Sequence, residues 1–395
     1  MAQQLFIAGG GIGGLAAALA CARAGWEPRV FEQAHELSEV GAGVQLGPNA
    51  TRLLHAWGLA DRLAGVASFP SRLDVRSASS GERLATMDLA GFNARYGAPY
   101  ATIHRADLQA MLLRAAQDAG VQLQTDMRVT AAHDGAHAVM ASVKAAGERV
   151  RDVECDALVG ADGLWSAVRG AVCADGPPLA TGHVAWRALA VQSRLPVGLR
   201  TSDVSVWLGP RLHVVAYPVR GGEMLNAVAI VHGKGSGAAS DWDQAGVAGD
   251  LHAAMGSMCA PLNELVHTLE NWRLWTLHDR DPMRGPESMA KGRIALLGDA
   301  AHPMRPYLAQ GAAMAMEDAA ELGRCLAMVE GADIELPLAL ARYALNRWQR
   351  VARVQSRARR NGRIFHATGV VRWGRDLSMR LLGERLLDQP WLYAA

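Results

Sequence analysis

Residues 4–32 read QLFIAGGGIGGLAAALACARAGWEPRVFE, and this stretch decides the fold. The apolar run 5–8 is long enough for a buried strand, and residues 28–31 form a second short run of the same kind. Between them, residues 15–23 are rich in alanine and predict a helix. The stretch therefore predicts a strand–helix–strand unit.

Three glycines between the first strand and the helix have the G-x-G-x-x-G spacing. Gly9 allows a tight turn, Gly11 lets the backbone approach a pyrophosphate, and Gly14 lets helix and strand pack closely. The helix N-terminus offers N–H groups and a positive dipole end to phosphates. Glu32 follows the second strand and can accept hydrogen bonds from a ribose. These residues predict a dinucleotide site, and by themselves leave open whether it takes FAD or NAD(P).

The chain has 395 residues, which favours two domains over one. Half of the residues are hydrophobic and the net charge is +2, so no overall field points to nucleic acid. No run is long and apolar enough to span a membrane. The cysteines have no C-x-x-C spacing, which predicts inert buried thiols in a reducing cytoplasm and no metal site. These cysteines are Cys21, Cys155, Cys173, Cys259 and Cys325.

The middle of the chain changes from alternating strands and helices to strands alone. Helices are expected at residues 50–59 and 105–119, and buried strands at 155–159 and 293–297. The alternating segments 184–191, 204–208, 213–217 and 224–231 predict an antiparallel sheet, as do short strands within 71–99. The fold class is therefore α/β: a Rossmann-like nucleotide domain with an inserted, mostly antiparallel sheet and a helical C-terminus.

We expect the domains to be discontinuous in sequence. The predicted nucleotide domain comprises residues 1–70, 100–180 and 278–360. The predicted substrate-binding sheet domain comprises 71–99 and 181–277, and 361–395 form a C-terminal helical segment.

Three further motifs accompany the glycine loop. Asp162-Gly163 follows a buried strand, Gly298-Asp299 follows another, and Arg105 lies in the segment Thr-Ile-His-Arg-Ala-Asp-Leu at 102–108. In this order, from residue 4 to about residue 325, they resemble the motifs of the single-component FAD-dependent aromatic hydroxylases, the para-hydroxybenzoate hydroxylase type. Only one G-x-G-x-x-G is found, so only one dinucleotide is bound in that way.

The resemblance implies which residues line FAD. Asp299 would accept hydrogen bonds from ribityl hydroxyls, although an aspartate there could also cap the next helix. The helix start at Gln310 would direct N–H groups to the N1/C2 edge of the flavin. Small residues in 40–49 suggest backbone lying against a flat ligand. The full expected set is Gly9, Gly11, Gly13, Gly14, Glu32, Gln33, Gln45, Arg105, Val129, Asp299, Gln310, Gly311 and Ala312.

His213 and Tyr217 are the expected catalytic and substrate-binding residues. They are four apart on a predicted strand and so project from the same face. This strand resembles the corresponding strand of hydroxybenzoate and hydroxynicotinate hydroxylases in the family. A histidine with a pKa near neutrality could take the phenolic proton of a substrate. The alternative is a structural histidine beside a core tyrosine.

Further substrate contacts are expected from Arg187 on another strand and from Arg305, Pro306 and Tyr307 on the loop after the Gly-Asp motif. Either arginine could pair with a substrate carboxylate or could instead be a solvated surface charge.

The resemblance implies an enzyme of aromatic catabolism that uses NADH or NADPH and O2. Reduced FAD would form a flavin hydroperoxide that hydroxylates a hydroxybenzoate, salicylate or hydroxynicotinate. Two alternatives are a hydroxylase of larger apolar or quinone-type substrates and a flavoprotein electron carrier that inserts no oxygen. We expect a cytoplasmic monomer or homodimer.

The C-terminal region is basic and then amphipathic. Seven arginines between positions 347 and 363 are interleaved with alanine and valine, which favours a solvated helix face over nucleic acid or membrane binding. Residues 370–391 carry Leu377, Leu381, Leu382 and Leu386, which we expect to pack on the body of the protein or on a dimer partner.

Overall fold

The computed structural model describes residues 3–37, 42–233 and 243–394, and the chain packs as two compact units. The first unit comprises Met1–Ser38, Leu108–Leu179 and Asp279–Ala358, and the second comprises Glu39–Asp107, Ala180–His278 and Arg359–Ala395. Packing therefore groups residues 39–70, 100–107 and 361–395 with the antiparallel sheet, unlike the predicted domain boundaries. The functional domain boundaries stay a prediction.

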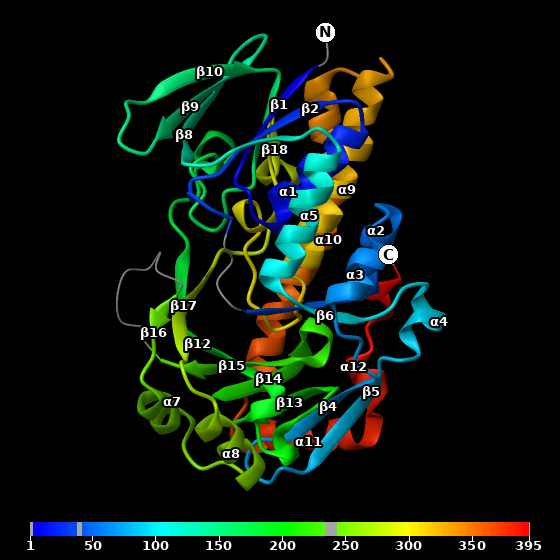
Figure 1. Ribbon diagram of the computed structural model, residues 1–395, viewed down its shortest axis with the longest axis vertical. Helices are drawn as coiled ribbons and strands as arrows, with labels where there is room; N and C mark the ends of the chain where they lie inside the picture. Colours follow the sequence, from blue (N-terminus) through cyan, green and yellow to red (C-terminus); the bar gives the residue numbers. More distant parts are fainter. Residues whose placement is uncertain (1–2, 38–41, 234–242, 395) are drawn as a thin grey trace. The chain divides into compact units, whose positions relative to one another are not determined.

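A six-stranded sheet forms the centre of the first unit (Figure 1). Its order is β18 (Ala290–Lys291), β19 (Ile294–Leu296), β11 (Ala157–Gly160), β1 (Gln4–Ala8), β2 (Glu27–Phe31) and β7 (Gln122–Gln124). Neighbouring strands run parallel except for β18 and β19. The central strands β1, β11 and β19 are short and, apart from Gln4, apolar and buried, as expected for parallel strands that are covered on both faces.

Helix α1 (Ile12–Arg23) connects β1 and β2, so the predicted strand–helix–strand unit is confirmed. Its alanine-rich surface lets α9 (Gly311–Glu330) pack closely, since a Cβ on Gly323 would lie 2.9 Å from the carbonyl oxygen of Ala20. The remaining elements of this unit are an antiparallel sheet and further helices. They are β8 (Met127–Asp134), β9 (Val139–Ala145), β10 (Arg151–Cys155), α5 (Arg105–Asp118), α6 (Arg169–Val172) and α10 (Leu336–Phe365), where α5 and α10 each extend beyond the unit's bounds.

An eight-stranded sheet forms the second unit, as the alternating segments predicted. Its order is β16 (Gln244–Ala245), β17 (Arg273–Asp279), β12 (Leu179–Val191), β15 (Met224–His232), β14 (Leu212–Val219), β13 (Val204–Gly209), β4 (Arg72–Ser77) and β5 (Arg83–Asp88). The central pairs β12–β15, β15–β14 and β14–β13 are antiparallel, while β13 and β4 are parallel.

Smaller elements complete the second unit. They are β3 (Gly43–Leu46) paired with β6 (Ala101–His104), and helices α2 (Pro48–Ala56), α3 (Ala60–Val66), α4 (Phe92–Tyr96), α7 (Ala248–Met255), α8 (Ala260–Thr268), α11 (Gly369–Leu382), α12 (Glu384–Leu387) and α13 (Pro390–Tyr393).

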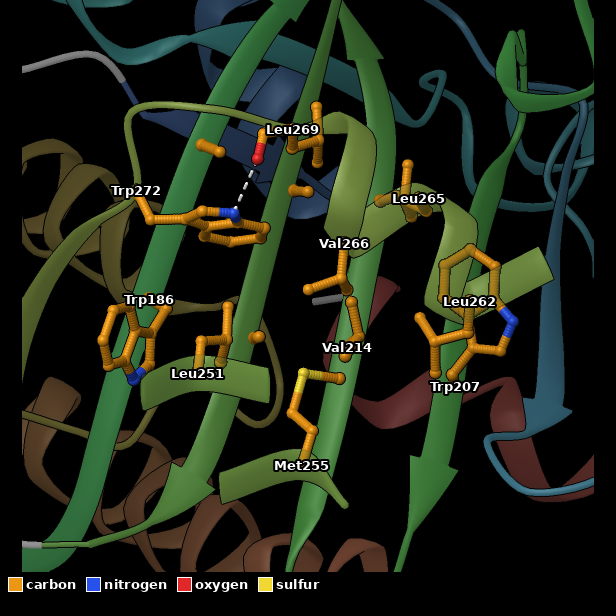
Figure 2. Close-up of a cluster of buried hydrophobic side chains, with 14 of the residues drawn as sticks. Trp186, Trp207, Val214, Leu251, Met255, Leu262, Leu265, Val266, Leu269 and Trp272 are labelled. Atoms are coloured by element: carbon orange, nitrogen blue, oxygen red, sulfur yellow. Dashed lines mark hydrogen bonds between the residues drawn. The ribbon is translucent and has the colours of Figure 1, made fainter. Parts of the chain in front are cut away.

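A tryptophan-rich core covers one face of the eight-stranded sheet (Figure 2). Trp186 on β12 lies beside Leu251 of α7, and Trp207 on β13 lies beside Leu262 of α8. Trp272 is 2% exposed and donates its indole N–H to the carbonyl oxygen of Leu269 at 3.0 Å. Because side chains alternate along a strand, this core leaves the odd-numbered residues of β14 on the opposite face.

The C-terminal region corrects one expectation and leaves another open. Arg347 is not on a solvated face: it is 6% exposed, and its guanidinium pairs with Asp318 at 2.8 Å and Glu317 at 2.9 Å. The four leucines of 370–391 are only partly covered, since all are at least 36% exposed and Leu381 is 74% exposed, and their packing on the body or on a dimer partner stays a prediction. Among the described residues, no helix combines the length and the apolarity needed to cross a membrane.

Candidate functional site

The glycine loop follows β1 and has little room for side chains. Gly9 has a φ of +105°, and a Cβ there would lie 2.4 Å from the carbonyl oxygen of Ala161. A Cβ on Gly14 would lie 1.9 Å from the carbonyl oxygen of Gly9. A Cβ on Gly11 would meet no described atom within 4 Å. Gly9 and Gly14 therefore shape the turn, and the backbone at Gly11 is open to a close ligand at the start of α1.

Gly13 faces the protein itself. A Cβ there would lie 2.9 Å from Leu297 Cδ1 and 3.2 Å from Ala315 Cβ, so this glycine permits helix packing. Its expected contact with the cofactor would have to come from its backbone.

Glu32 lies beside this loop at the carboxyl end of β2. Its carboxylate accepts hydrogen bonds from the backbone N–H of Gly10 at 2.6 Å and of Ala34 at 2.8 Å. Gln109 donates to the Gly10 carbonyl oxygen at 3.0 Å from α5, a contact that the sequence did not indicate. Two other residues of this unit were expected to contact FAD: Gln33 is exposed, and Val129 is buried in β8.

Asp162 has a structural role in its motif. Its carboxylate accepts hydrogen bonds from the Ser166 hydroxyl at 2.5 Å and from the backbone N–H of Ala167 at 2.7 Å and Val168 at 3.2 Å. Burial raises the pKa of this carboxyl group, although these hydrogen bonds oppose the shift. The motif closes a turn that places Arg169.

Arg169 connects the Asp-Gly motif to the Gly-Asp motif. Its buried guanidinium donates to the carbonyl oxygens of Ala300 at 2.7 Å and Ala301 at 2.6 Å, and it pairs with Asp175. It therefore fixes the loop that carries Asp299 by backbone hydrogen bonds.

Asp299 lies inside a short 3-10 turn, Gly298–Ala300, and its side chain is exposed. Gln310 is the N-cap residue of α9, so the alternative that Asp299 caps the next helix is wrong. Gln310 is 3% exposed, and Gly311 and Ala312 are half-buried in the first turn of α9. An exposed carboxylate after a buried parallel strand remains suited to binding hydroxyl groups.

A buried ionic cluster supports the same loop. Asp318 of α9 accepts the backbone N–H of Gly298 at 3.1 Å and contacts Nε2 of His302 at 2.5 Å. Burial alone would raise the pKa of Asp318, but His302 and Arg347 hold it below its usual value.

In the second unit, Gln45 and Arg105 lie on neighbouring segments. The amide oxygen of Gln45 accepts the Tyr100 hydroxyl at 2.6 Å, and the backbone N–H of Arg105 donates to the carbonyl oxygen of Ala42 at 2.8 Å. Val40 and Gly41, the start of the small-residue segment, lie outside the described residues.

His213 and Tyr217 both lie on the face of β14 opposite the tryptophan-rich core, and both are 3% exposed. Tyr217 pairs in register with Asn226 of β15. Asn226 is fully buried and accepts the backbone N–H of Gly43 at 2.8 Å. A Cβ on Gly43 would lie 2.5 Å from Tyr217 Cε2, so this glycine is needed for the close approach.

The expectation of a near-neutral pKa for His213 is wrong in this structure. Burial, with a smaller effect of His183, lowers the pKa of His213 to about 3, so its imidazole is neutral. Nδ1 of His213 lies 2.8 Å from Nε2 of His366, a hydrogen bond between residues 153 positions apart. Burial raises the pKa of Tyr217, which therefore remains a phenol.

Neither predicted arginine is a free surface charge. Arg187 is 2% exposed and pairs with Asp243 at 2.6 Å, which also contacts Arg273. In the first unit, Arg305 is half-buried and pairs with Asp279 at 2.6 Å. Pro306 next to it is exposed, and Tyr307 is 3% exposed.

Comparison with known proteins supports the FAD site that the glycine loop and the other motifs predicted. Residues 2–358 match the family described as FAD binding domain. The chain belongs to this family. It is thus an FAD-dependent enzyme of the monooxygenase type, as the four motifs predicted.

Its relatives match along the whole chain. It is 38% identical to 3-hydroxybenzoate 6-hydroxylase of Polaromonas naphthalenivorans (strain CJ2), covering 98% of this chain and 95% of that protein. It is 32% identical to 6-hydroxynicotinate 3-monooxygenase of Pseudomonas fluorescens, covering 95% and 93%. Among solved structures, Klebsiella pneumoniae HpxO complexed with FAD and uric acid has a TM-score of 0.84 at 26% identity, covering 98% of this chain and 94% of that one.

Proposed function

We propose that this protein hydroxylates a small aromatic acid that already carries a ring hydroxyl, using NAD(P)H and O2. The observation that carries the proposal is the full-length similarity to 3-hydroxybenzoate 6-hydroxylase, with 38% of residues identical. Bound FAD supplies the redox chemistry, because it takes electrons from NAD(P)H and activates O2 for transfer of one oxygen atom.

In the first unit, we assign the FAD contacts to four places. The open backbone at Gly11 meets the pyrophosphate, Glu32 accepts from a ribose hydroxyl, and Asp299 accepts from ribityl hydroxyls. The N-terminus of α9, at Gln310 to Ala312, offers N–H groups to the electron-rich edge of the ring. Gln33 and Val129 of this unit, and Gln45 and Arg105 of the second, are proposed contacts from the family resemblance.

His213 would act as a neutral hydrogen-bonding group. If its Nδ1–H donates to Nε2 of His366, its own Nε2 can accept the hydrogen of the substrate hydroxyl. Accepting that hydrogen bond raises electron density on the ring, which favours attack by an electrophilic oxygen. Tyr217, held as a phenol, would orient the same substrate by donating a hydrogen bond.

Arg187 is our first choice for the substrate carboxylate. It projects from β12 on the same sheet face as His213 and Tyr217, in register with Val228 of β15. Two guanidinium groups, Arg187 and Arg273, share the single carboxylate of Asp243, so this cluster has an excess positive charge. Arg305, which pairs one-to-one with Asp279, is the second choice, with Pro306 and Tyr307 beside it as pocket residues.

All five cysteines are free thiols, and four are buried, which supports a reducing cytoplasmic location. We propose a monomer or homodimer. The exposed leucines of α11 and α12 favour the homodimer.

The test is NADH and NADPH oxidation by the FAD-loaded protein with hydroxybenzoates, salicylate and hydroxynicotinates, together with product analysis. We expect one hydroxybenzoate to stimulate oxidation and to yield one hydroxylated product per NAD(P)H. His213→Ala should retain FAD and lose at least tenfold in coupled product. Oxidation that no aromatic acid stimulates, or that yields only hydrogen peroxide, would overturn the proposal.

A further inference from the structure

Four histidines gather at one end of the eight-stranded sheet. His183 of β12 and His232 of β15 are partners in register, and His213 lies near the start of β14. His366 follows α10, and its ring centroid lies 5.0 Å from those of His183 and His232 and 5.1 Å from that of His213. Four imidazoles so close together call for a chemical explanation beyond a single base.

We propose that His183, His232 and His366 form a binding site for a divalent transition-metal ion such as Zn²⁺. One ring nitrogen from each residue lies within 4.8 Å of the others. A tetrahedral zinc ion with Zn–N bonds of about 2.0–2.1 Å needs nitrogens about 3.4 Å apart. Small side-chain rotations would therefore bring the three nitrogens into contact with one ion.

The backbone around the three ligands is well supported. The backbone N–H of Arg211 donates to the carbonyl oxygen of His366 at 3.1 Å, and that of His232 donates to the carbonyl oxygen of Arg211 at 3.1 Å. Arg375 donates to the carbonyl oxygen of Phe365 at 2.6 Å. These contacts hold His366 against the sheet before any ion binds.

The surroundings of the three rings leave a way for an ion to reach them. His232 is exposed while His183 and His366 are buried, so an ion can enter from solvent. Two positive groups lie near, but Arg375 pairs with Asp376 at 2.7 Å and Arg211 is exposed to screening solvent.

Three imidazole ligands determine which metal ions the site prefers. They favour Zn²⁺, Co²⁺, Ni²⁺ and Cu²⁺ over Mg²⁺ and Ca²⁺, which prefer oxygen ligands. Three protein ligands leave a fourth position for water or a small anion.

The site would also act on His213. Nε2 of His366 is in the hydrogen bond to His213, so Nδ1 is the atom that His366 can offer to the ion. A metal on Nδ1 leaves a hydrogen on Nε2, which must then donate to Nδ1 of His213. His213 would carry its hydrogen on Nε2 and could no longer accept one from the substrate. This inhibition rests on the proposed function, whereas metal binding does not.

The test is isothermal titration of the chelator-treated FAD-loaded protein with ZnCl2, without substrate. We expect one Zn²⁺ per chain, and at least a tenfold weaker Kd in His232→Gln, whose exposed side chain makes the variant safe for folding. The control is His267→Gln, which alters the separate pair His252 and His267, with ring centroids 3.8 Å apart, and should leave the Kd unchanged. Replacing Zn²⁺ by Co²⁺ should give the visible absorption of a four-coordinate site.

Absence of a Zn²⁺ site tighter than about 100 μM, which is about 5.5 kcal/mol of binding free energy, would overturn the proposal. So would equal affinity in His232→Gln, or loss of the site in His267→Gln. Zn²⁺ should inhibit hydroxylation in wild type at least tenfold more strongly than in His232→Gln. If the ion binds but coupled product is unaffected, the metal site stands and the role of His213 is refuted.

Discussion

Gly11 and Gly14 offer a paired test of how this chain holds FAD, because an added methyl group meets different surroundings at the two positions. At Gly14 a Cβ would lie 1.9 Å from the carbonyl oxygen of Gly9, whereas real Cβ contacts stay above 3.0 Å. The backbone would have to move by at least about 1 Å, and overpacking of this kind costs about 1–3 kcal/mol. Gly14→Ala should therefore lower the free energy of unfolding of the FAD-free protein.

Gly11→Ala should behave differently. No described atom lies within 4 Å of the added Cβ, and the backbone at Gly11, with φ of −72°, accepts an alanine. Unfolding of the FAD-free protein should change by no more than about 0.5 kcal/mol. The methyl group would nevertheless occupy the space that the pyrophosphate needs, so the Kd for FAD should rise at least tenfold, about 1.4 kcal/mol.

The assay combines urea unfolding of the FAD-free proteins with FAD titration followed by flavin fluorescence. The reasoning is refuted if Gly11→Ala binds FAD with wild-type affinity. It is also refuted if Gly14→Ala unfolds at the wild-type midpoint, because the contact with Gly9 would then impose no cost.

Four further predictions concern other parts of the chain. Glu32→Ala should reduce flavin content per chain at 450 nm, and unchanged content would exclude the proposed ribose contact. Trp272→Ala should cost about 3–5 kcal/mol of unfolding free energy in urea, because it empties a site that is 2% exposed; Trp272→Phe should cost less. Arg347→Met should cost about 3–5 kcal/mol, because it leaves the buried carboxylate of Asp318 without its guanidinium partner, whereas Glu317 keeps its ion pair with Arg350. The pKa of Asp318 in the folded protein lies below its unfolded value near 3.8, so its ionised carboxylate stabilises the fold above that pH, and this stabilisation is lost as the pH falls through the folded pKa. Asp318→Asn should therefore make the free energy of unfolding fall less steeply as the pH is lowered. An unchanged acid dependence would contradict this.

The fold could be predicted because its signals are local. The spacing of Gly9, Gly11 and Gly14 reflects contacts within one turn, and the alternation around His213 and Tyr217 sets their shared strand face. The strand–helix–strand unit and the antiparallel sheet were both predicted from such short patterns.

The candidate site was predicted less completely, because its contacts join distant segments. His366 lies 153 positions from His213, and no spacing rule links them. Arg347 was expected in solvent because its neighbours in sequence resemble those of a surface helix, whereas its partners lie on α9. The pKa of His213 depends on burial and on His183, neither of which is visible in the residues around it.

Arg169 ties two motifs together in a way that constrains how they can vary. Its guanidinium donates to backbone carbonyl oxygens of Ala300 and Ala301, so no side-chain change at those two positions can compensate for its loss. Lysine has a single nitrogen and cannot span both carbonyls and Asp175 in the same fixed geometry. In a saturation mutagenesis screen, Arg169→Lys should therefore be defective, and no second substitution in the Gly-Asp loop should rescue it. Defects at position 169 should be epistatic to defects at Asp299.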